Sequence, residues 1–203
     1  MPLGPNPPQF NALKPDTDLV TVTIGANDIS IGDLWSSCAR LGPTDPLGSP
    51  CQRQATAGGV DLYAQRVAAA APKVAQVLDG IRQRSPRATV VLVDYLRVVP
   101  STTGCYPDLS IARGDVSYMD TVQQQLTAML AEQARKHSAA FVDSYTNAAD
   151  HDACQPPGVK WAKGTAPTSS ATAMHPNATG MAAVTGLLLD KLASIGRGPD
   201  AAG

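Results

Sequence analysis

The sequence predicts one α/β domain over residues 1–203, in which helices flank a parallel sheet. Three short segments that read as strands, the first rich in β-branched residues, alternate with three longer segments whose apolar residues recur at helical spacing. The second short segment, residues 88–93, is an apolar run typical of a strand covered on both faces. Apolar residues make up 43% of the chain and charged residues 16%, a balance that supports a sizeable core.

The first half of the chain is expected to hold one strand, one long loop and one helix. Residues 18–24 are rich in Val and Thr and end at Gly25, which is typical of a strand. Residues 32–59 are crowded with Gly, Pro, Ser and Cys, so we expect a loop region that forms a lid or wall. Over residues 60–84 the apolar spacing predicts a helix, which Pro72 should kink or split.

The middle of the chain repeats the alternation of strand and helix. Residues 88–93 predict the second strand, and apolar residues between 119 and 130 mark a helix that ends near His137. Residues 139–142 predict a third, buried strand. In a parallel sheet the carboxyl ends of the strands meet at one edge, where such folds place their chemistry.

A long loop and a closing helix complete the predicted elements. Residues 148–173 are rich in Pro, Gly and Ser and predict a loop. The last helix begins near Asn177 and stops at Gly196, with a frayed tail over residues 196–203. Its expected apolar stripe consists of Met181, Val184, Leu188 and Ile195.

Charge and hydropathy exclude two classes of partner. The chain has 16 basic and 17 acidic residues, a net charge of −1, which disfavours nucleic-acid binding. Its longest apolar runs, such as residues 88–93 and 187–189, are far shorter than the ~20 residues that span a bilayer. Residues 1–8 have neither a basic nor an apolar segment, so no signal peptide is visible in this chain.

The four cysteines lie in loop-like surroundings rich in Gly and Pro. None forms a C-x-x-C pair, and the His and Cys spacing does not fit a zinc site, so no metal is expected. Four free thiols are one interpretation. We favour two disulfides, Cys38–Cys51 and Cys105–Cys154, which are typical of an oxidising compartment.

The segment after the first predicted strand carries the first candidate chemical group. It reads Gly25-Ala-Asn27-Asp28. Gly25 permits a close backbone approach, and the amide of Asn27 is a neutral donor of the kind that stabilises an oxyanion. The alternative is an ordinary turn in which Asn27 and Asp28 cap the backbone.

His175 carries the second candidate group, directly before the last predicted helix. An imidazole in that position can act as a general base near neutral pH. Pro176 after it suits the start of a helix. The alternative is a histidine that only caps the helix.

Together the two segments resemble the SGNH (GDSL-type) hydrolases, especially secreted actinobacterial esterases and lipases. Residues 25–28 match the Gly-x-Asn-Asp block of that family, and His175-Pro176 matches its His-Pro block. The resemblance covers nearly all of residues 9–195. It extends through three further segments: Pro15-Asp-Thr-Asp-Leu-Val, Thr103-Gly-Cys-Tyr-Pro107 and His151-Asp-Ala-Cys154.

The resemblance implies a fold, a function and residue roles. The fold is an SGNH-hydrolase-like, flavodoxin-like sheet, and the activity is ester hydrolysis without a metal or organic cofactor. Asn27 would be an oxyanion donor, Gly25 and Asp28 its supporting block, and His175 the base of an acyl transfer. The two proposed cysteine pairs match the usual disulfides of the family.

The chain departs from the family pattern at the nucleophile. The family's Gly-Asp-Ser block precedes Gly-x-Asn-Asp, yet none of the 24 residues before Gly25 is a serine. We therefore expect that the nucleophile and a central strand are missing from this chain. Ser144 follows the wrong strand, with Val142 in place of the expected Gly, so Ser144 and Ser30 are interpreted as structural.

A second departure lies three residues before His175, where most members of the family have an Asp. Here the residue is Thr172, which cannot ionise. Its backbone carbonyl could accept from the second ring nitrogen of His175, which would give a Ser–His dyad in place of a triad.

The leading hypothesis is an exported esterase or lipase whose nucleophile lies outside this chain. The full form would be secreted or held in the cell envelope, with an ester of a lipid, a glycan or a small molecule as substrate. The alternative is a non-catalytic remnant or a lipid- or glycan-binding module. A nucleotide-binding protein has little support, because no Gly-x-Gly-x-x-Gly follows any predicted strand.

Overall fold

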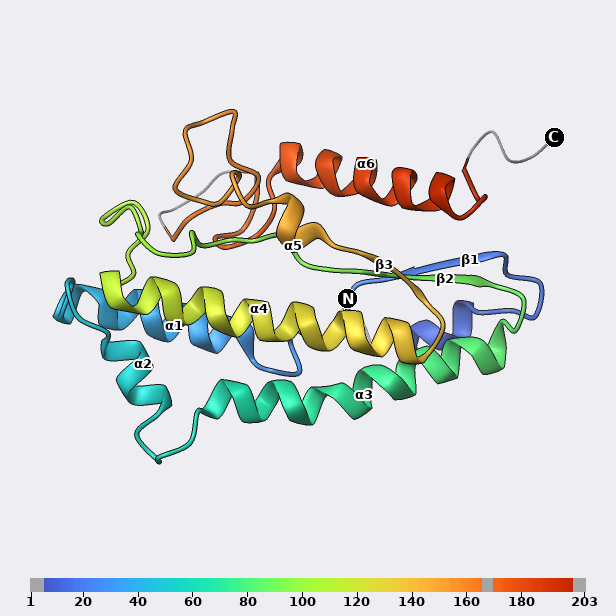
Figure 1. Cartoon of the computed structure of the whole chain (residues 1–203), viewed down its shortest axis with the longest axis horizontal. Coiled ribbons are helices and arrows are strands. Elements are labelled where there is room, and N and C mark those ends of the chain that lie inside the picture. Colours follow the sequence, from blue (N-terminus) through green and yellow to red (C-terminus); the bar gives the residue numbers. More distant parts are fainter. Residues whose placement is uncertain (1–5, 166–169, 199–203) are drawn as a thin grey trace, which may run out of the picture.

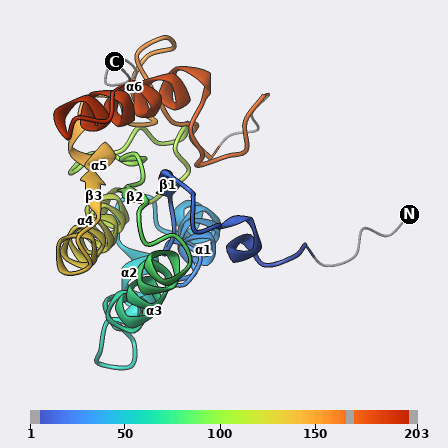
Figure 2. The same ribbon diagram turned by 90° about the vertical axis from the view of Figure 1, so that its right-hand side faces the viewer.

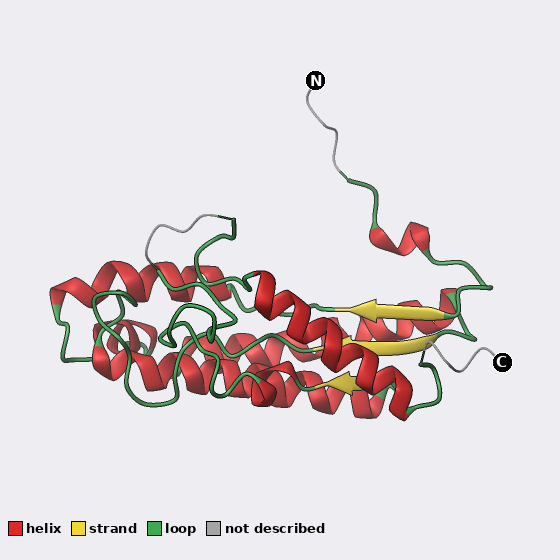
Figure 3. Ribbon diagram, turned by 90° about the horizontal axis from the view of Figure 1, so that it is seen from above, coloured by secondary structure: helices red, strands yellow, loops and turns green. Residues whose placement is uncertain are grey.

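A three-stranded parallel sheet organises the protein. The computed structural model describes residues 6–165 and 170–198. The strands lie in the order β1 (Leu19–Val22), β2 (Thr89–Val93), β3 (Ala140–Val142), each within its predicted range. All three point toward the same group of loops in Figure 3, which confirms the predicted parallel sheet.

Helices cover both faces of this sheet. The long helices α3 (Leu62–Arg84) and α4 (Arg113–Lys136) lie side by side below one face, whereas α6 (Ala178–Ser194) lies on the other (Figure 1, Figure 2). This layered arrangement confirms the predicted α/β fold. The remaining elements are short: η1 (Gln9–Ala12), α1 (Ile31–Leu41), η2 (Gly42–Thr44), α2 (Pro50–Ala55) and α5 (Ser144–Asn147).

The central strand β2 divides the buried apolar residues between the two faces. Val90 and Leu92 belong to the large core under α3 and α4. Val91 and Val93 belong to a small cluster with Val142 and α6. Because successive strand residues point to opposite faces, an unbroken apolar run is what a strand covered on both sides requires.

The predicted apolar stripe of α6 is only partly buried. Val184 and Leu188 pack against the sheet as predicted. The prediction is wrong for Met181 and Ile195, which are 58% and 42% exposed. A sheet of three strands covers only part of the apolar surface of this helix.

The predicted loop over residues 32–59 is wrong, because most of it lies in the helices α1 and α2. Ile31, Leu34 and Cys38 recur at helical spacing and are buried in the large core. Cys38 is joined to Cys51 in α2 by a disulfide. Burial and the cross-link stabilise two short helices whose composition alone favours a loop.

The helix α3 continues through Pro72, so the predicted split is wrong. Proline removes one backbone donor and leaves the carbonyl four residues earlier, that of Ala68, without its helical partner. Pro72 and Ala68 are both exposed, so water can satisfy that carbonyl.

The end of α4 and the start of α6 lie where the sequence predicts them. His137 caps α4, and the Asn177 side chain accepts a hydrogen bond from Gly180 at the start of α6. The described part of residues 148–173 forms no helix and no strand beyond one isolated bridge, at Ala162. Most of the predicted frayed tail lies outside the described residues.

No helix in the described ranges has the length and apolar character of a membrane span.

Candidate active site

The segment after β1 turns sharply at Gly25. Its φ of +110° is a conformation that residues with a side chain rarely adopt. The backbone N–H of Ala26 donates to the Tyr95 hydroxyl at 3.3 Å, and Lys73 Nζ lies 3.1 Å from Asp28 Oδ1. These contacts hold the turn from both sides and leave the Asn27 side chain exposed.

One cavity of about 370 Å³ brings Asn27 and His175 together. The two residues are far apart in the sequence: Asn27 follows β1, and His175 precedes α6. The cavity wall also includes Trp35 of α1, whose ring meets the His175 imidazole edge-on with 6.2 Å between centroids. The structure thus places the two candidate residues that the sequence identified, Asn27 and His175, in one cavity.

The His175 ring is oriented by a backbone carbonyl, one residue away from the predicted position. Its Nδ1 lies 2.8 Å from the carbonyl oxygen of Ala173. The carbonyl of Thr172 instead accepts from the backbone N–H of His175, at 3.2 Å. Since a carbonyl oxygen can only accept, Nδ1 carries the proton of the neutral ring, and Nε2 is left as the basic nitrogen.

The left-handed backbone of Met174 explains this one-residue difference. Its φ of 61° turns the chain between Ala173 and His175, so the nearer carbonyl faces the ring. The side chain of Met174 is buried and lines the same cavity.

Asp94 is a buried carboxyl group on the cavity wall, directly after β2. It is 2% exposed, and its Oδ2 accepts a hydrogen bond from Thr127 Oγ1 of α4 at 2.8 Å. Burial raises the pKa of Asp94 from 3.8 to about 7. The charge of Asp143 also raises this pKa. Hydrogen bonds from Thr127 and from the backbone N–H groups of Tyr95 and Tyr145 lower it.

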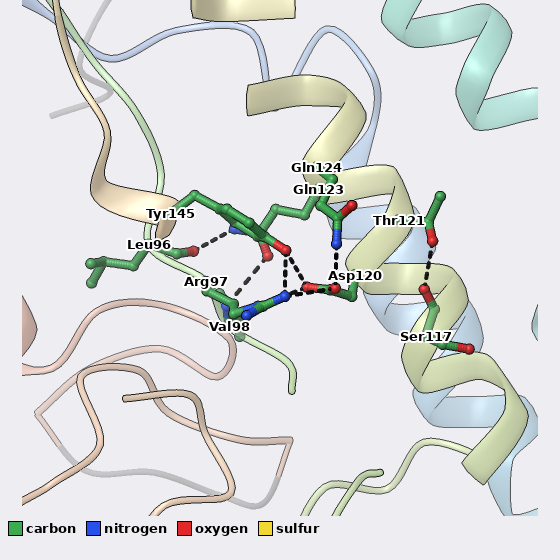
Figure 4. Close-up of polar contacts among 9 residues, drawn as sticks. All are labelled: Leu96, Arg97, Val98, Ser117, Asp120, Thr121, Gln123, Gln124 and Tyr145. Carbon is green, nitrogen blue, oxygen red and sulfur yellow. Dashed lines mark hydrogen bonds and ion pairs between the residues drawn. The ribbon is translucent and has the colours of Figure 1, made fainter. Parts of the chain in front are cut away.

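A second polar cluster lies on the α4 side of the same sheet edge (Figure 4). Arg97 donates to both carboxylate oxygens of Asp120, at 2.9 and 2.8 Å, and the Tyr145 hydroxyl donates to Asp120 at 2.6 Å. The Gln123 amide bonds the backbone on both sides of Arg97. Burial, followed by the bond to Asp120, raises the pKa of Tyr145 to about 12. This cluster fixes the segment that follows Asp94 and Tyr95.

No serine lines the cavity among the described residues. Ser144 is fully buried at the start of α5, and Ser30 lies at the start of α1 with a φ of 55°. The described residues also contain no group of three His, Cys, Asp or Glu side chains that could hold a metal ion.

Comparison with known proteins identifies the family of this chain. The sequence model of the GDSL-like lipase/acylhydrolase family matches residues 3–183. The chain belongs to this family. The resemblance inferred from residues 25–28 and His175-Pro176 is thereby confirmed at the level of the family.

Two curated lipases are similar to this chain. Lipase 2 of Streptomyces coelicolor is 34% identical over 178 residues, which cover 85% of this chain and 59% of that protein. A lipase of Streptomyces rimosus is 30% identical over 173 residues, with the same coverages of 85% and 59%. The chain thus spans about three fifths of the length of these relatives.

Solved structures of GDSL-like enzymes confirm the fold. Phospholipase A1 from Streptomyces albidoflavus NA297 has a TM-score of 0.67 at 24% identity and supports the fold alone. The extracellular lipase from Streptomyces rimosus has a TM-score of 0.61 at 26% identity. Each alignment covers 92% of this chain and 72% of the other.

Both predicted disulfides, Cys38–Cys51 and Cys105–Cys154, are present and leave no free cysteine. The sequence alone assigned no role to three residues of the site: Trp35, Asp94 and Tyr95. Asp94 and Tyr95 directly follow the second predicted strand, which is the same signal that singled out residues 25–28. Trp35 lies in the region expected to be a loop, so the sequence offered no signal for it.

Proposed function

We propose that the chain supplies the histidine and the oxyanion donor of a carboxylic-ester hydrolase site. The observation that carries the proposal is the shared cavity of Asn27 and His175. Membership of the GDSL-like lipase/acylhydrolase family and the lipase and esterase names of the relatives point to the same reaction class.

His175 is the general base in this proposal. With Nδ1 held by the Ala173 carbonyl, Nε2 accepts the proton of a serine hydroxyl as its oxygen attacks the ester carbonyl carbon. The imidazolium then gives that proton to the alcohol, which leaves as the C–O bond breaks. Water repeats the sequence on the acyl-enzyme and releases the acid.

Asn27 is the proposed oxyanion donor. Its exposed amide can donate to the carbonyl oxygen as negative charge develops in the tetrahedral intermediate. Gly25 gives the turn its shape, and the ion pair of Asp28 with Lys73 holds it. Tyr95 accepts from the Ala26 N–H and fixes the residue next to Asn27.

The nucleophile is proposed to lie outside residues 1–203. This part of the proposal is supported by the cavity, where none of the described serines lines the wall. It is also supported by the burial of Ser144 and by the family pattern, in which a Gly-Asp-Ser block precedes Gly-x-Asn-Asp. The 203-residue chain is then expected to lack esterase activity.

The substrate is proposed to be an ester of a lipid, a glycan or a small molecule. Its apolar part would enter the largely apolar cavity. The full form is proposed to be secreted or held in the cell envelope. Two disulfides support an oxidising compartment, and one similar solved structure is described as an extracellular lipase.

Labelling with a fluorophosphonate probe and hydrolysis of p-nitrophenyl butyrate test the proposal together. A form extended by upstream in-frame residues that encode Gly-Asp-Ser should hydrolyse the ester and be labelled at that serine. The 203-residue chain should show neither reaction. Robust hydrolysis by the 203-residue chain, with a label on Ser30 or Ser144, would contradict the proposed position of the nucleophile.

A further inference from the structure

The backbone on both sides of His175 is paired with residues 160–163, which we call the supporting segment. The N–H of Lys163 donates to the carbonyl of His175 at 3.0 Å, and the carbonyl of Lys163 accepts from the N–H of Met174 at 3.2 Å. Ala162 forms an isolated antiparallel bridge with Pro176. Hydrogen bonds of the main chain thus fix the backbone of His175, although its side chain is exposed.

The supporting segment holds Met174 in an unfavourable conformation. The φ of Met174 is 61°, in the left-handed region that residues with a side chain rarely adopt. Its N–H donates to the carbonyl of Lys163 and lies 3.3 Å from that of Gly164. Such a conformation persists only where the surrounding structure holds it. Because it turns the Ala173 carbonyl toward Nδ1 of His175, the ring orientation depends on the supporting segment.

Asn177 joins the supporting segment to the start of α6. Its backbone N–H donates to the carbonyl of Trp161 at 2.8 Å, and its Nδ2 donates to the carbonyl of Lys160 at 2.7 Å. Its Oδ1 accepts from the N–H of Gly180 at 2.9 Å and so caps the helix. One side chain therefore caps α6 and ties this helix to the segment that pairs with His175.

Gly180 allows α6 and the supporting segment to approach each other closely. A methyl group at Gly180 would overlap the carbonyl oxygen of Trp161, which is the acceptor for Asn177. A methyl group at Gly186, farther along the same helix, would meet no described atom within 4 Å outside the helix backbone. Glycine is unfavourable in a helix, so its presence at position 180 is explained by this contact.

The supporting segment is also anchored on the side away from His175. The Trp161 ring stacks on that of His151, with 3.8 Å between centroids and an angle of 2° between the planes. The N–H of Trp161 donates to the carbonyl of His151 at 2.8 Å. Shortly after His151, Cys154 is cross-linked to Cys105. The segment is therefore held from two sides, which a group that positions another residue requires.

We propose that the supporting segment positions the His175 imidazole for proton transfer, and that Asn177 and Gly180 are the positioning residues that fix its place. The inference rests on the proposed function, because it takes His175 as the general base. Asn177 and Gly180 act through His175. A displacement of a reacting group by about 1 Å can lower the rate on the order of 100-fold.

Asn177→Asp separates the two roles of this side chain. Asp is as good a helix cap as Asn, so the hydrogen bond from Gly180 is retained. The Nδ2 donor is lost, and a carboxylate oxygen faces the carbonyl of Lys160 instead. In a serine-bearing form, kcat for p-nitrophenyl butyrate should fall about 10-fold and KM should stay within about twofold.

Gly180→Ala should lower kcat about 100-fold in the same form, because it displaces the supporting segment itself. Gly186→Ala is the matched control on the same helix and should leave kcat unchanged. Unchanged kcat in both Asn177→Asp and Gly180→Ala would overturn the inference.

Amide hydrogen exchange and ¹⁵N chemical shifts in the 203-residue chain test the inference without hydrolysis. In Asn177→Asp and Gly180→Ala the N–H groups of Lys163 and Met174 should exchange at least about 10-fold faster, whereas those of β2 should not change. The His175 ring should then carry its proton on either nitrogen instead of on Nδ1 alone. Unchanged exchange and an unchanged ring tautomer in both variants would overturn the inference.

The proposed function is tested separately by the parent serine-bearing form. If that form does not hydrolyse the ester, the proposed function fails, and the exchange rates and the tautomer decide the inference on their own.

Discussion

The two faces of the sheet differ in how completely they are packed. On the face under α3 and α4, residues such as Leu126 and Leu130 are at most 1% exposed within one large core. On the face under α6, a small cluster around Val91 and Val93 is buried, and Met181 and Leu189 of the helix are about half exposed. The cavity lies at the sheet edge beside the start of α6, and residues of α1 and α4 complete its wall.

Polar groups follow the same division. Asp120, on α4, is buried with three hydrogen bonds from Arg97 and Tyr145. His175, directly before α6, is exposed, and its ring contacts the backbone carbonyl of Ala173. The packed face thus supplies stability, whereas the start of α6 presents His175 to the cavity.

The largest effect is expected at His175, in a form of the protein that carries the serine. His175→Ala should lower kcat for a p-nitrophenyl ester on the order of 10⁶-fold, as removal of the base does in serine hydrolases. The melting temperature should hardly change, because His175 is exposed. His137→Ala is the control, since His137 caps the far end of α4 and should leave kcat unchanged. A similar loss in both variants would contradict the assigned role.

Asp94 should make stability depend on pH. Its pKa rises from 3.8 to about 7 on folding, so the folded state holds a proton that the unfolded chain has already lost. The contribution of Asp94 to the free energy of unfolding should therefore be fully present below about pH 4 and be lost, by up to about 4 kcal/mol, as the pH rises through about 7. Asp94→Asn should flatten this slope in urea titrations, and Asp143→Asn should not. An unchanged slope in Asp94→Asn would show that Asp94 is ionised in the folded protein.

Asn27→Ala should lower kcat in the serine-bearing form by roughly 10²- to 10³-fold with little change in KM, the usual loss for one oxyanion donor. Because the Asn27 side chain is exposed, the loss should occur without a change in melting temperature. An unchanged kcat would make Asn27 a turn residue only, which is the alternative that the sequence left open.

Matched leucine truncations compare the packing of the two faces directly. Leu130→Ala, in the large core, should lower the free energy of unfolding by about 3 kcal/mol because it leaves a cavity in close-packed surroundings. Leu188→Ala, on α6, should cost about 1 kcal/mol, since that side chain is only partly buried. Urea denaturation of both variants measures the difference. Equal losses would show that α6 packs as tightly as α4.

The sequence predicted the parts of the molecule that depend on local pattern. A β-branched run and two apolar runs predicted the three strands, and the residues directly after the first strand led to Asn27. The helices α1 and α2 were missed because the Gly, Pro and Ser content of residues 32–59 was given more weight than the helical spacing of Ile31, Leu34 and Cys38. The contact of Tyr95 with Ala26 joins residues 69 positions apart, so no local pattern could show it.

The smallest effect is expected at Thr172. Its carbonyl holds the backbone N–H of His175, and its side chain is exposed, so Thr172→Ala removes no contact of the ring. The serine-bearing variant should keep kcat/KM within about threefold of the parent, since a single exposed side chain far from the reacting atoms has little effect. The tautomer can be measured in the 203-residue chain with and without Thr172→Ala. In both, the ¹⁵N chemical shifts of the neutral His175 imidazole should show the proton on Nδ1, because the Ala173 carbonyl is unaffected. A loss of activity as deep as that of His175→Ala, or a proton on Nε2, would show that the ring is oriented through residue 172 after all.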